Sequence, residues 1–192
     1  MNLTIDYYNR NAEEYCEKTL KIPMQSIYDR FESYLKPGDK LLDLGCGSGR
    51  DSMYFLSRRF DVVAVDGAME ICKIAEKNIG KKVRTIQFEE LDYTNEFDAI
   101  WASASLLHVN RDGLDFVVER ILLALRQGGV LYASWKSGTT DRSVDGKNYT
   151  DMTEKDVAEL FVKFDVDVLE TWVSCDLLSR GNEWINVIVK KF

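Results

Sequence analysis

Three glycines that alternate with other residues follow an apolar run and form the segment best suited to chemistry. Residues 41–44 are apolar apart from Asp43, and Gly45, Gly47 and Gly49 come directly after them. A buried parallel strand that ends in a glycine turn and then opens a helix lets a ligand approach the backbone closely, because glycine has no β-carbon. This stretch therefore predicts a binding site for a cofactor that contains a nucleoside.

The residues around the glycines indicate which cofactor that is. A dinucleotide fingerprint, G-x-G-x-x-G, needs glycine at position 50, where this chain has Arg50. Asp66 closes the next apolar run, residues 62–65. An acid at the carboxyl end of a parallel strand lies where open α/β sheets bind ligands, and it can accept hydrogen bonds from both hydroxyls of an adenosine ribose. Asp66 can alternatively be a helix cap, and Asp43 can anchor the loop by accepting backbone amides.

These residues carry a resemblance to a known family. The run from Asp43 to Gly49 has the pattern Asp-x-Gly-x-Gly-x-Gly and resembles the first motif of class I S-adenosylmethionine (SAM) dependent methyltransferases. Asp66 lies where that family holds the ribose. Further segments resemble the later motifs in the same order: Leu91-Asp92 at the adenine contacts, residues 97–101 with 106–109 at the fourth strand, and residues 128–131 at the turn into the fifth strand. The likeness covers roughly residues 35 to 136.

The resemblance implies SAM as the cofactor and transfer of its methyl group to an acceptor. It implies cofactor contacts along the glycine turn, at the ends of the neighbouring strands and in an N-terminal lid. The residues expected to contact SAM are Tyr15, Asp43, Gly45, Cys46, Gly47, Gly49, Asp66, Gly67, Ala68, Asp92 and Ala102. Asp92 can alternatively be a plain turn residue in an acidic segment.

The acceptor is expected at the same edge of the sheet. His108 is the only histidine of the chain, and its ordinary pKa near 6.5 suits removal of a proton; in many enzymes that the chain resembles, a histidine there serves the loop instead. Residues 137–149 are expected to form a long, polar, mobile loop. Opposite it, tyrosines at helical spacing either pack or form an aromatic wall suited to a sulfonium. A small, partly aromatic or anionic acceptor fits this site, with contacts from Tyr7, Tyr8, Trp135, Lys136, Arg142 and Tyr149.

The apolar pattern predicts an α/β fold. Residues 5–35 have helical periodicity and predict two helices broken near Pro23. After the glycine turn, strands alternate with helices, which predicts a parallel sheet covered on both faces. The expected helices are residues 50–58, 68–78 and 113–125, and the expected strands are residues 62–65, 83–88, 99–103 and 130–135.

The C-terminal part follows a different pattern. Residues 153–161 predict a helix with a capping box of Thr153 and Asp156. Residues 164–172 and 184–189 then predict two strands that pair antiparallel, because no helix separates them. A polar stretch joins them, with Ser179, Arg180, Gly181 and Asn182. The expected whole is a Rossmann-like seven-stranded mixed sheet whose last two strands form an antiparallel hairpin, with helices on both faces.

Composition narrows the class of protein. With 192 residues and 45% hydrophobic content, residues 1–192 are expected to form a single domain, with residues 1–36 as a helical lid and residues 37–192 as the Rossmann-like core. No apolar run reaches the roughly 18 residues of a membrane span and the first ten residues are too polar for a signal peptide, so a cytoplasmic protein is expected. The four cysteines lack metal or disulfide spacing, so no metal is expected. The net charge of −7 and the scattered basic residues count against nucleic acid as a partner.

The sequence therefore predicts a methyltransferase that uses SAM and a small-molecule acceptor, as a monomer or homodimer. Within the family, the chain most resembles compact bacterial enzymes of the tellurite-resistance and ubiquinone-pathway type. Two alternatives stay open: a non-catalytic SAM-binding regulatory module, and a nucleotide-dependent oxidoreductase.

Overall fold

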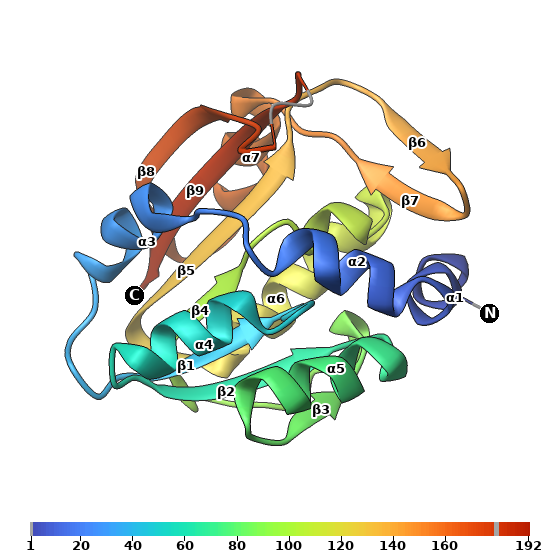
Figure 1. Ribbon diagram of the computed structural model, residues 1–192. Coiled ribbons are helices and arrows are strands. Elements are labelled where there is room, and N and C mark those ends of the chain that lie inside the picture. Colours follow the sequence, from blue (N-terminus) through green and yellow to red (C-terminus); the bar gives the residue numbers. More distant parts are fainter. Residues whose placement is uncertain (1, 179–180) are drawn as a thin grey trace.

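The computed structural model describes residues 2–178 and 181–192 (Figure 1). One seven-stranded sheet forms its centre, in the order β3-β2-β1-β4-β5-β9-β8. Its strands are β1 (Lys40–Leu44), β2 (Asp61–Asp66), β3 (Val83–Thr85), β4 (Phe97–Ala102), β5 (Leu125–Lys136), β8 (Val166–Cys175) and β9 (Glu183–Lys191). The first five strands of this order pair in parallel, and β9 pairs antiparallel with both β5 and β8. The predicted mixed sheet with a final antiparallel pair is confirmed.

Helices cover both faces of the sheet (Figure 1). They are α1 (Leu3–Arg10), α2 (Ala12–Thr19), α3 (Gln25–Glu32), α4 (Arg50–Ser57), α5 (Met69–Ile79), α6 (Leu114–Ala124) and α7 (Glu154–Phe161). Alternate residues of β4 show the two layers, because successive side chains of a strand point to opposite faces. Trp101 packs in a cluster with Phe31 of α3 and Phe55 of α4, whereas Ile100 packs in a cluster with residues of α6 and α7.

The N-terminal segment has one helix more than predicted. The chain breaks at Asn11 as well as near Pro23, so α1 and α2 are separate helices. The Asn11 side chain donates to the backbone carbonyl of Tyr7 at 2.8 Å. Asparagine competes in this way with the helix's own backbone bonds and favours an end or a turn.

Residues 137–149 differ most from the prediction, which was a mobile loop. They hold most of a β-hairpin, formed by β6 (Asp141–Val144) and β7 (Lys147–Thr150). Asp145 and Gly146 make the turn, both with positive φ, at 54° and 80°. Asp-Gly is a strong signal for such a two-residue turn, so the hairpin was readable from the sequence.

Other boundaries shift only slightly. The strand expected over residues 83–88 ends at Thr85, and a short 3-10 helix, Phe88–Glu90, follows. The capping box before α7 is confirmed, since Asp156 accepts the backbone N–H of Thr153 at 2.8 Å and Thr153 accepts that of Asp156 at 3.1 Å. Of the predicted connection between the last two strands, Ser179 and Arg180 lie outside the described residues. Within the described part of the chain, no helix is both long and apolar enough to span a bilayer.

Candidate active site

Two adjoining cavities lie at the carboxyl edge of the parallel strands. The larger has a volume of about 260 Å³ and the smaller of about 90 Å³. Tyr8, Tyr15, Gly45, Ala104 and His108 line both of them. Strands β1 and β4 end beside these cavities, while α1 and α2 contribute the tyrosines. The two cavities therefore meet where the glycine turn faces the N-terminal helices.

The glycine turn lines the larger cavity with four consecutive residues, from Gly45 to Ser48. Gly47 has a φ of 54°, and a β-carbon built on it points at the Tyr15 ring, 3.5 Å away. Gly49 has a φ of 80°, but a β-carbon there would lie 2.7 Å from Ile79 of α5. Gly47 thus keeps space for a ligand, whereas Gly49 lets α4 begin in close contact with α5. Both backbone conformations are ones that L side chains rarely adopt.

Asp66 closes the smaller cavity from the end of β2. Its carboxylate accepts the backbone N–H of Gly47 at 3.0 Å and that of Ala68 at 2.9 Å. Burial raises the pKa of Asp66, and these amides act to lower it. A carboxylate has about four acceptor positions, so capacity remains on Asp66 for a ligand. Gly67 and Ala68 line the same cavity.

Asp43 lies beneath the turn. Its side chain is buried, and its carboxylate accepts the Ser52 hydroxyl at 2.6 Å. Burial, followed by the charge of Asp51, raises the pKa of Asp43 well above its usual range. Asp43 is therefore tied to the first turn of α4 through the Ser52 side chain.

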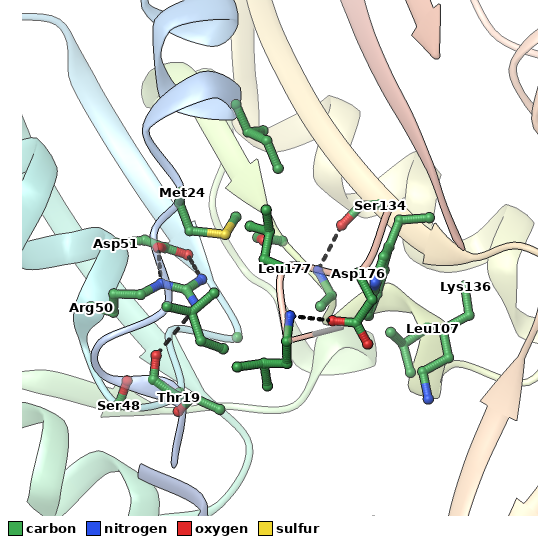
Figure 2. Close-up of a pocket in the computed structure, with 18 of the residues that line it drawn as sticks. Thr19, Met24, Ser48, Arg50, Asp51, Leu107, Ser134, Lys136, Asp176 and Leu177 are labelled. Carbon is green, nitrogen blue, oxygen red and sulfur yellow. Dashed lines mark hydrogen bonds and ion pairs between the residues drawn. The ribbon is translucent and has the colours of Figure 1, made fainter. Parts of the chain in front are cut away.

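Arg50 and Asp51 belong to a site that sequence reasoning missed. Arg50 donates to Asp51 through Nε at 2.6 Å and Nη2 at 2.9 Å, and its Nη1 lies 3.5 Å from the carbonyl oxygen of Thr19. Figure 2 shows its guanidinium between these two partners. Asp51 also accepts the indole N–H of Trp101 at 2.8 Å and the hydroxyl of Tyr28. Arg50 therefore lines the larger cavity as a positioned cation; the sequence had shown it only as a mismatch to the dinucleotide fingerprint.

His108 is held between two partners. Its Nδ1 lies 2.7 Å from the carbonyl oxygen of Asn148 in β7, and its Nε2 lies 2.8 Å from the Tyr8 hydroxyl. A carbonyl oxygen only accepts, so Nδ1 carries the proton and Nε2 accepts from Tyr8. Burial, the main cause, lowers the pKa of His108 to about 4, with further lowering by the charges of Lys147 and Lys136. The imidazole is therefore neutral at pH 7.

Cations and tyrosines gather at the end of the larger cavity next to β7. Lys147 lies with Nζ 3.8 Å from the centroid of the Tyr7 ring, and the Nζ of Lys136 lies 4.5 Å from that of Tyr149. All four residues line this cavity. Lys147 is a second residue that the sequence analysis did not select, because nothing local distinguishes it from a surface lysine.

Six expected site residues line neither described cavity: Asp43 and Gly49, whose contacts are given above, and Asp92, Ala102, Trp135 and Arg142. Asp92 is exposed and pairs with Arg84 at 2.6 Å. Trp135 and Ala102 are fully buried in the core. Arg142 stacks on Tyr149 but is paired with Asp151, through two contacts of 2.9 Å.

Most of the other expected site residues line the larger cavity. Cys46 lines the larger cavity beside Gly47, and so do Tyr7, Tyr8, Tyr15, Lys136 and Tyr149. Across the described residues, no group of three or more His, Cys, Asp or Glu side chains is arranged to hold a metal ion.

The comparison with protein families finds a known domain in this chain. Residues 41–129 match the family model of the methyltransferase domain. Over 84 residues the chain is 37% identical to phosphoethanolamine N-methyltransferase 1 of Arabidopsis thaliana, which covers 39% of this chain and 17% of that protein. The chain thus spans less than a fifth of the length of this curated relative.

Solved structures share the fold over the full length. A 1,6-didemethyltoxoflavin-N1-methyltransferase of Burkholderia thailandensis, with bound 1,6-didemethyltoxoflavin and S-adenosylhomocysteine, has a TM-score of 0.83 at 21% identity and covers 98% of this chain and 87% of that one. A magnesium protoporphyrin IX methyltransferase of Synechocystis PCC 6803, with bound SAM, has a TM-score of 0.77 at 15% identity and covers 100% and 98%. At these identities the likeness shows the fold alone. Residues 41–129 thus match the methyltransferase domain, and the fold built around the glycine turn is one that SAM-dependent methyltransferases share.

Proposed function

We propose that this protein transfers a methyl group from SAM to a small-molecule acceptor. The observation that carries the proposal is the meeting of two cavities at the glycine turn, with Asp66 in the smaller and Arg50 in the larger. The smaller cavity suits a nucleoside and the larger suits an amino-acid tail and an acceptor. The two share Tyr8 and His108, so the reacting atoms would meet beside this pair.

The smaller cavity fits adenosine in its chemistry. Asp66 retains acceptor capacity for the ribose hydroxyls, which are donors. Ile86 and Phe88 add apolar and aromatic surface for a flat base, next to the polar side chains of Gln87 and Glu89. This combination of a carboxylate with apolar walls is typical of pockets that orient a ligand through few polar groups.

Arg50 fits the carboxylate of the methionine portion. Its guanidinium is held by Asp51 and lies close to the Thr19 carbonyl, so little side-chain entropy is left to lose on binding. It lines the cavity next to Gly47 and Ser48, and the backbone amides at the start of α4 add to the attraction for an anion. We therefore assign Arg50 to SAM binding, in addition to the glycine turn.

When bound, SAM supplies an electrophilic methyl group: the lone pair of the acceptor atom forms the new bond to carbon while the electron pair of the S–C bond stays on sulfur. The chain's own residues have to align the acceptor and exclude water. Such alignment is worth roughly 7 to 11 kcal/mol in well-oriented systems. Tyr15 stands over Gly47, where its ring would cover the site.

The Tyr8 and His108 pair offers a path for a proton. A proton lost by the acceptor would pass through the Tyr8 hydroxyl to Nε2 of His108, 2.8 Å away, and the lowered pKa of about 4 makes this imidazole a weak base. An acceptor that already has a free lone pair does not need this step. His108 then only holds Tyr8 in place.

The relatives support a small acceptor, since the Arabidopsis protein is named for phosphoethanolamine and the Burkholderia protein holds 1,6-didemethyltoxoflavin. A cytoplasmic location, a monomer or homodimer, the lid role of residues 1–36 and the likeness to tellurite-resistance and ubiquinone-pathway enzymes stay predictions.

The test combines binding with turnover. Calorimetry should give saturable binding of SAM, and a screen of small-molecule acceptors should release S-adenosylhomocysteine only when a suitable acceptor is present. Binding of SAM with no turnover over a broad acceptor panel would favour the non-catalytic module. Failure to bind SAM would contradict the proposal.

A further inference from the structure

We propose that the acceptor carries an anionic group, a phosphate monoester or a carboxylate, that binds to Tyr7, Lys136, Lys147 and Tyr149. These four residues are here called the cation-aromatic cluster. The inference deepens the proposed function, on which it rests, by naming the chemical class of the acceptor.

The cluster joins three separate parts of the chain. Lys136 ends β5, Lys147 and Tyr149 belong to β7, and Tyr7 lies on α1. The Nζ of Lys147 lies 3.8 Å from the Tyr7 ring centroid and 5.9 Å from that of Tyr149. The Nζ of Lys136 lies 4.5 Å from the same Tyr149 ring. Two ammonium groups therefore lie around one aromatic ring in the wall of the larger cavity.

The charges of this region favour an anion. Among the described residues, no carboxylate lies within ion-pair distance of Lys147. Both lysines are close enough to His108 for their charges to lower its pKa. Like charges in a partly buried site repel each other, and an anion between them relieves this.

The carboxylates that line the larger cavity have other partners. Asp51 is paired with Arg50, and Asp176 accepts the backbone N–H of Leu178 at 3.0 Å and the side-chain amide of Asn182 at 3.2 Å. Figure 2 shows Arg50 and Lys136 on opposite sides of the cavity. The cavity thus has the Arg50–Asp51 ion pair beside the glycine turn and a separate group of cations next to β7.

Arg142 does not belong to this group. Its guanidinium lies 4.6 Å from the Tyr149 ring centroid, yet both of its contacts with Asp151 are 2.9 Å long. Its charge is therefore compensated within the hairpin region. Lys147, rather than Arg142, is the cation of the hairpin that is available to an acceptor.

The cation-aromatic cluster lies next to Tyr8 and His108, where the reaction is proposed to take place. The Tyr149 ring centroid is 5.1 Å from that of His108, and the Tyr7 ring centroid is 5.6 Å from that of Tyr8. An anion held by the cluster would place the rest of a small acceptor beside Tyr8 and His108. The acceptor is then a small molecule whose methylated atom lies a few bonds from its anionic group.

The experiment measures anion binding without requiring turnover. Inorganic phosphate and acetate are titrated separately, into the free protein and into the protein saturated with S-adenosylhomocysteine, with NMR of the protein and of phosphorus as readouts. The variants are Lys147→Gln and Lys136→Gln, and Lys155→Gln, at an exposed side chain of α7, is the matched control.

We expect saturable binding of at least one anion. Tighter binding of phosphate indicates an acceptor with a phosphate monoester, and tighter binding of acetate indicates an acceptor with a carboxylate. Loss of a charge-assisted contact should weaken that binding about tenfold or more in Lys147→Gln and Lys136→Gln, with the control unchanged and SAM affinity retained in all three. Equal anion binding by wild type and Lys147→Gln, or no saturable binding of either anion, overturns the inference. If the wild type does not bind SAM, the proposed function is contradicted, whereas the anion site is not. The titration of the free protein tests the anion site without SAM.

Discussion

At the scale of single residues, Asp66 combines two tasks that are often separate. It holds the glycine turn by accepting the amides of Gly47 and Ala68, and it faces the smaller cavity with its remaining acceptor positions. A change at this position therefore alters both the turn and the contact with the ribose.

Asp66→Asn should weaken SAM binding by about 1 to 3 kcal/mol, because the ribose hydroxyls lose a charged acceptor while one amide oxygen still serves the turn. Calorimetry measures the change. Asp61→Asn, on the exposed start of the same strand, is the matched control and should bind as the wild type does. An unchanged dissociation constant for folded Asp66→Asn would mean that the acid serves only the turn.

The lowered pKa of His108 predicts how the free energy of unfolding depends on pH. Its pKa is about 4 in the folded protein and near 6.5 when unfolded, so the unfolded chain binds the proton more tightly. The contribution of neutral His108 to the free energy of unfolding is therefore fully present above about pH 6.5 and is lost as the pH falls toward 4. The expected loss from His108 alone between pH 7.5 and pH 5 is at most about 2 kcal/mol.

Urea unfolding of wild type and His108→Gln at both pH values tests this, since glutamine can still accept from Tyr8 but does not titrate. The difference between the two proteins removes the contribution of the carboxylates. If both proteins lose the same stability on acidification, then His108 is not held neutral in the fold.

At the scale of elements, the start of α4 is placed by contacts on both of its sides. Gly49 lets α4 approach α5, while Asp43 holds Ser52 from below. The hairpin of β6 and β7 is fixed to the rest of the site in a similar way, because the backbone N–H of Asn148 donates to the buried Thr4 hydroxyl at 3.0 Å. Helix α1, the hairpin and His108 are thus linked to one another around the cavities.

Two alanine variants separate packing from ligand contact in the glycine turn. Gly47→Ala and Gly49→Ala both force a positive φ on alanine, which costs roughly 1 to 2 kcal/mol. Gly49→Ala should lose more stability, since its β-carbon also meets Ile79 at 2.7 Å. Gly47→Ala should lose more SAM affinity, because its β-carbon enters the larger cavity.

Urea unfolding and calorimetry on the same samples give both quantities. The assignment of the two glycines is reversed if Gly49→Ala loses SAM affinity while Gly47→Ala keeps it.

At the scale of the whole molecule, the cavities lie between the sheet edge and the N-terminal helices. A ligand that fills them contacts parts of the chain that come from α1, α2, the glycine turn and the hairpin. Binding to the folded state alone stabilises it by mass action.

SAM at about 100 times its dissociation constant should add about 2.7 kcal/mol of stability. For a chain of this size that corresponds to a rise of about 5 to 11 °C in the unfolding temperature. NAD at the same concentration should give no comparable rise, because Arg50 stands where the dinucleotide fingerprint needs glycine. An equal rise with NAD would favour the oxidoreductase alternative.

The sequence by itself determined the framework of the site. Apolar runs and alternate glycines predicted the turn after β1, the position of Asp66 at the end of β2 and the antiparallel pairing of the last two strands. These features depend on local properties, namely the period of the apolar pattern, the freedom of glycine at positive φ and the length of the connections. They do not depend on where distant side chains point.

Only the tertiary structure decided which side chains reach the cavities. The contact between Tyr8 and His108 joins residues 100 positions apart, and Arg142 and Lys147, two similar cations of one hairpin, differ only because Asp151 pairs with the first. Asp92 has the right residue type for a ligand but is turned to Arg84 at the surface. Side-chain direction and charge compensation arise from packing between separate segments, so no local pattern of residues specifies them.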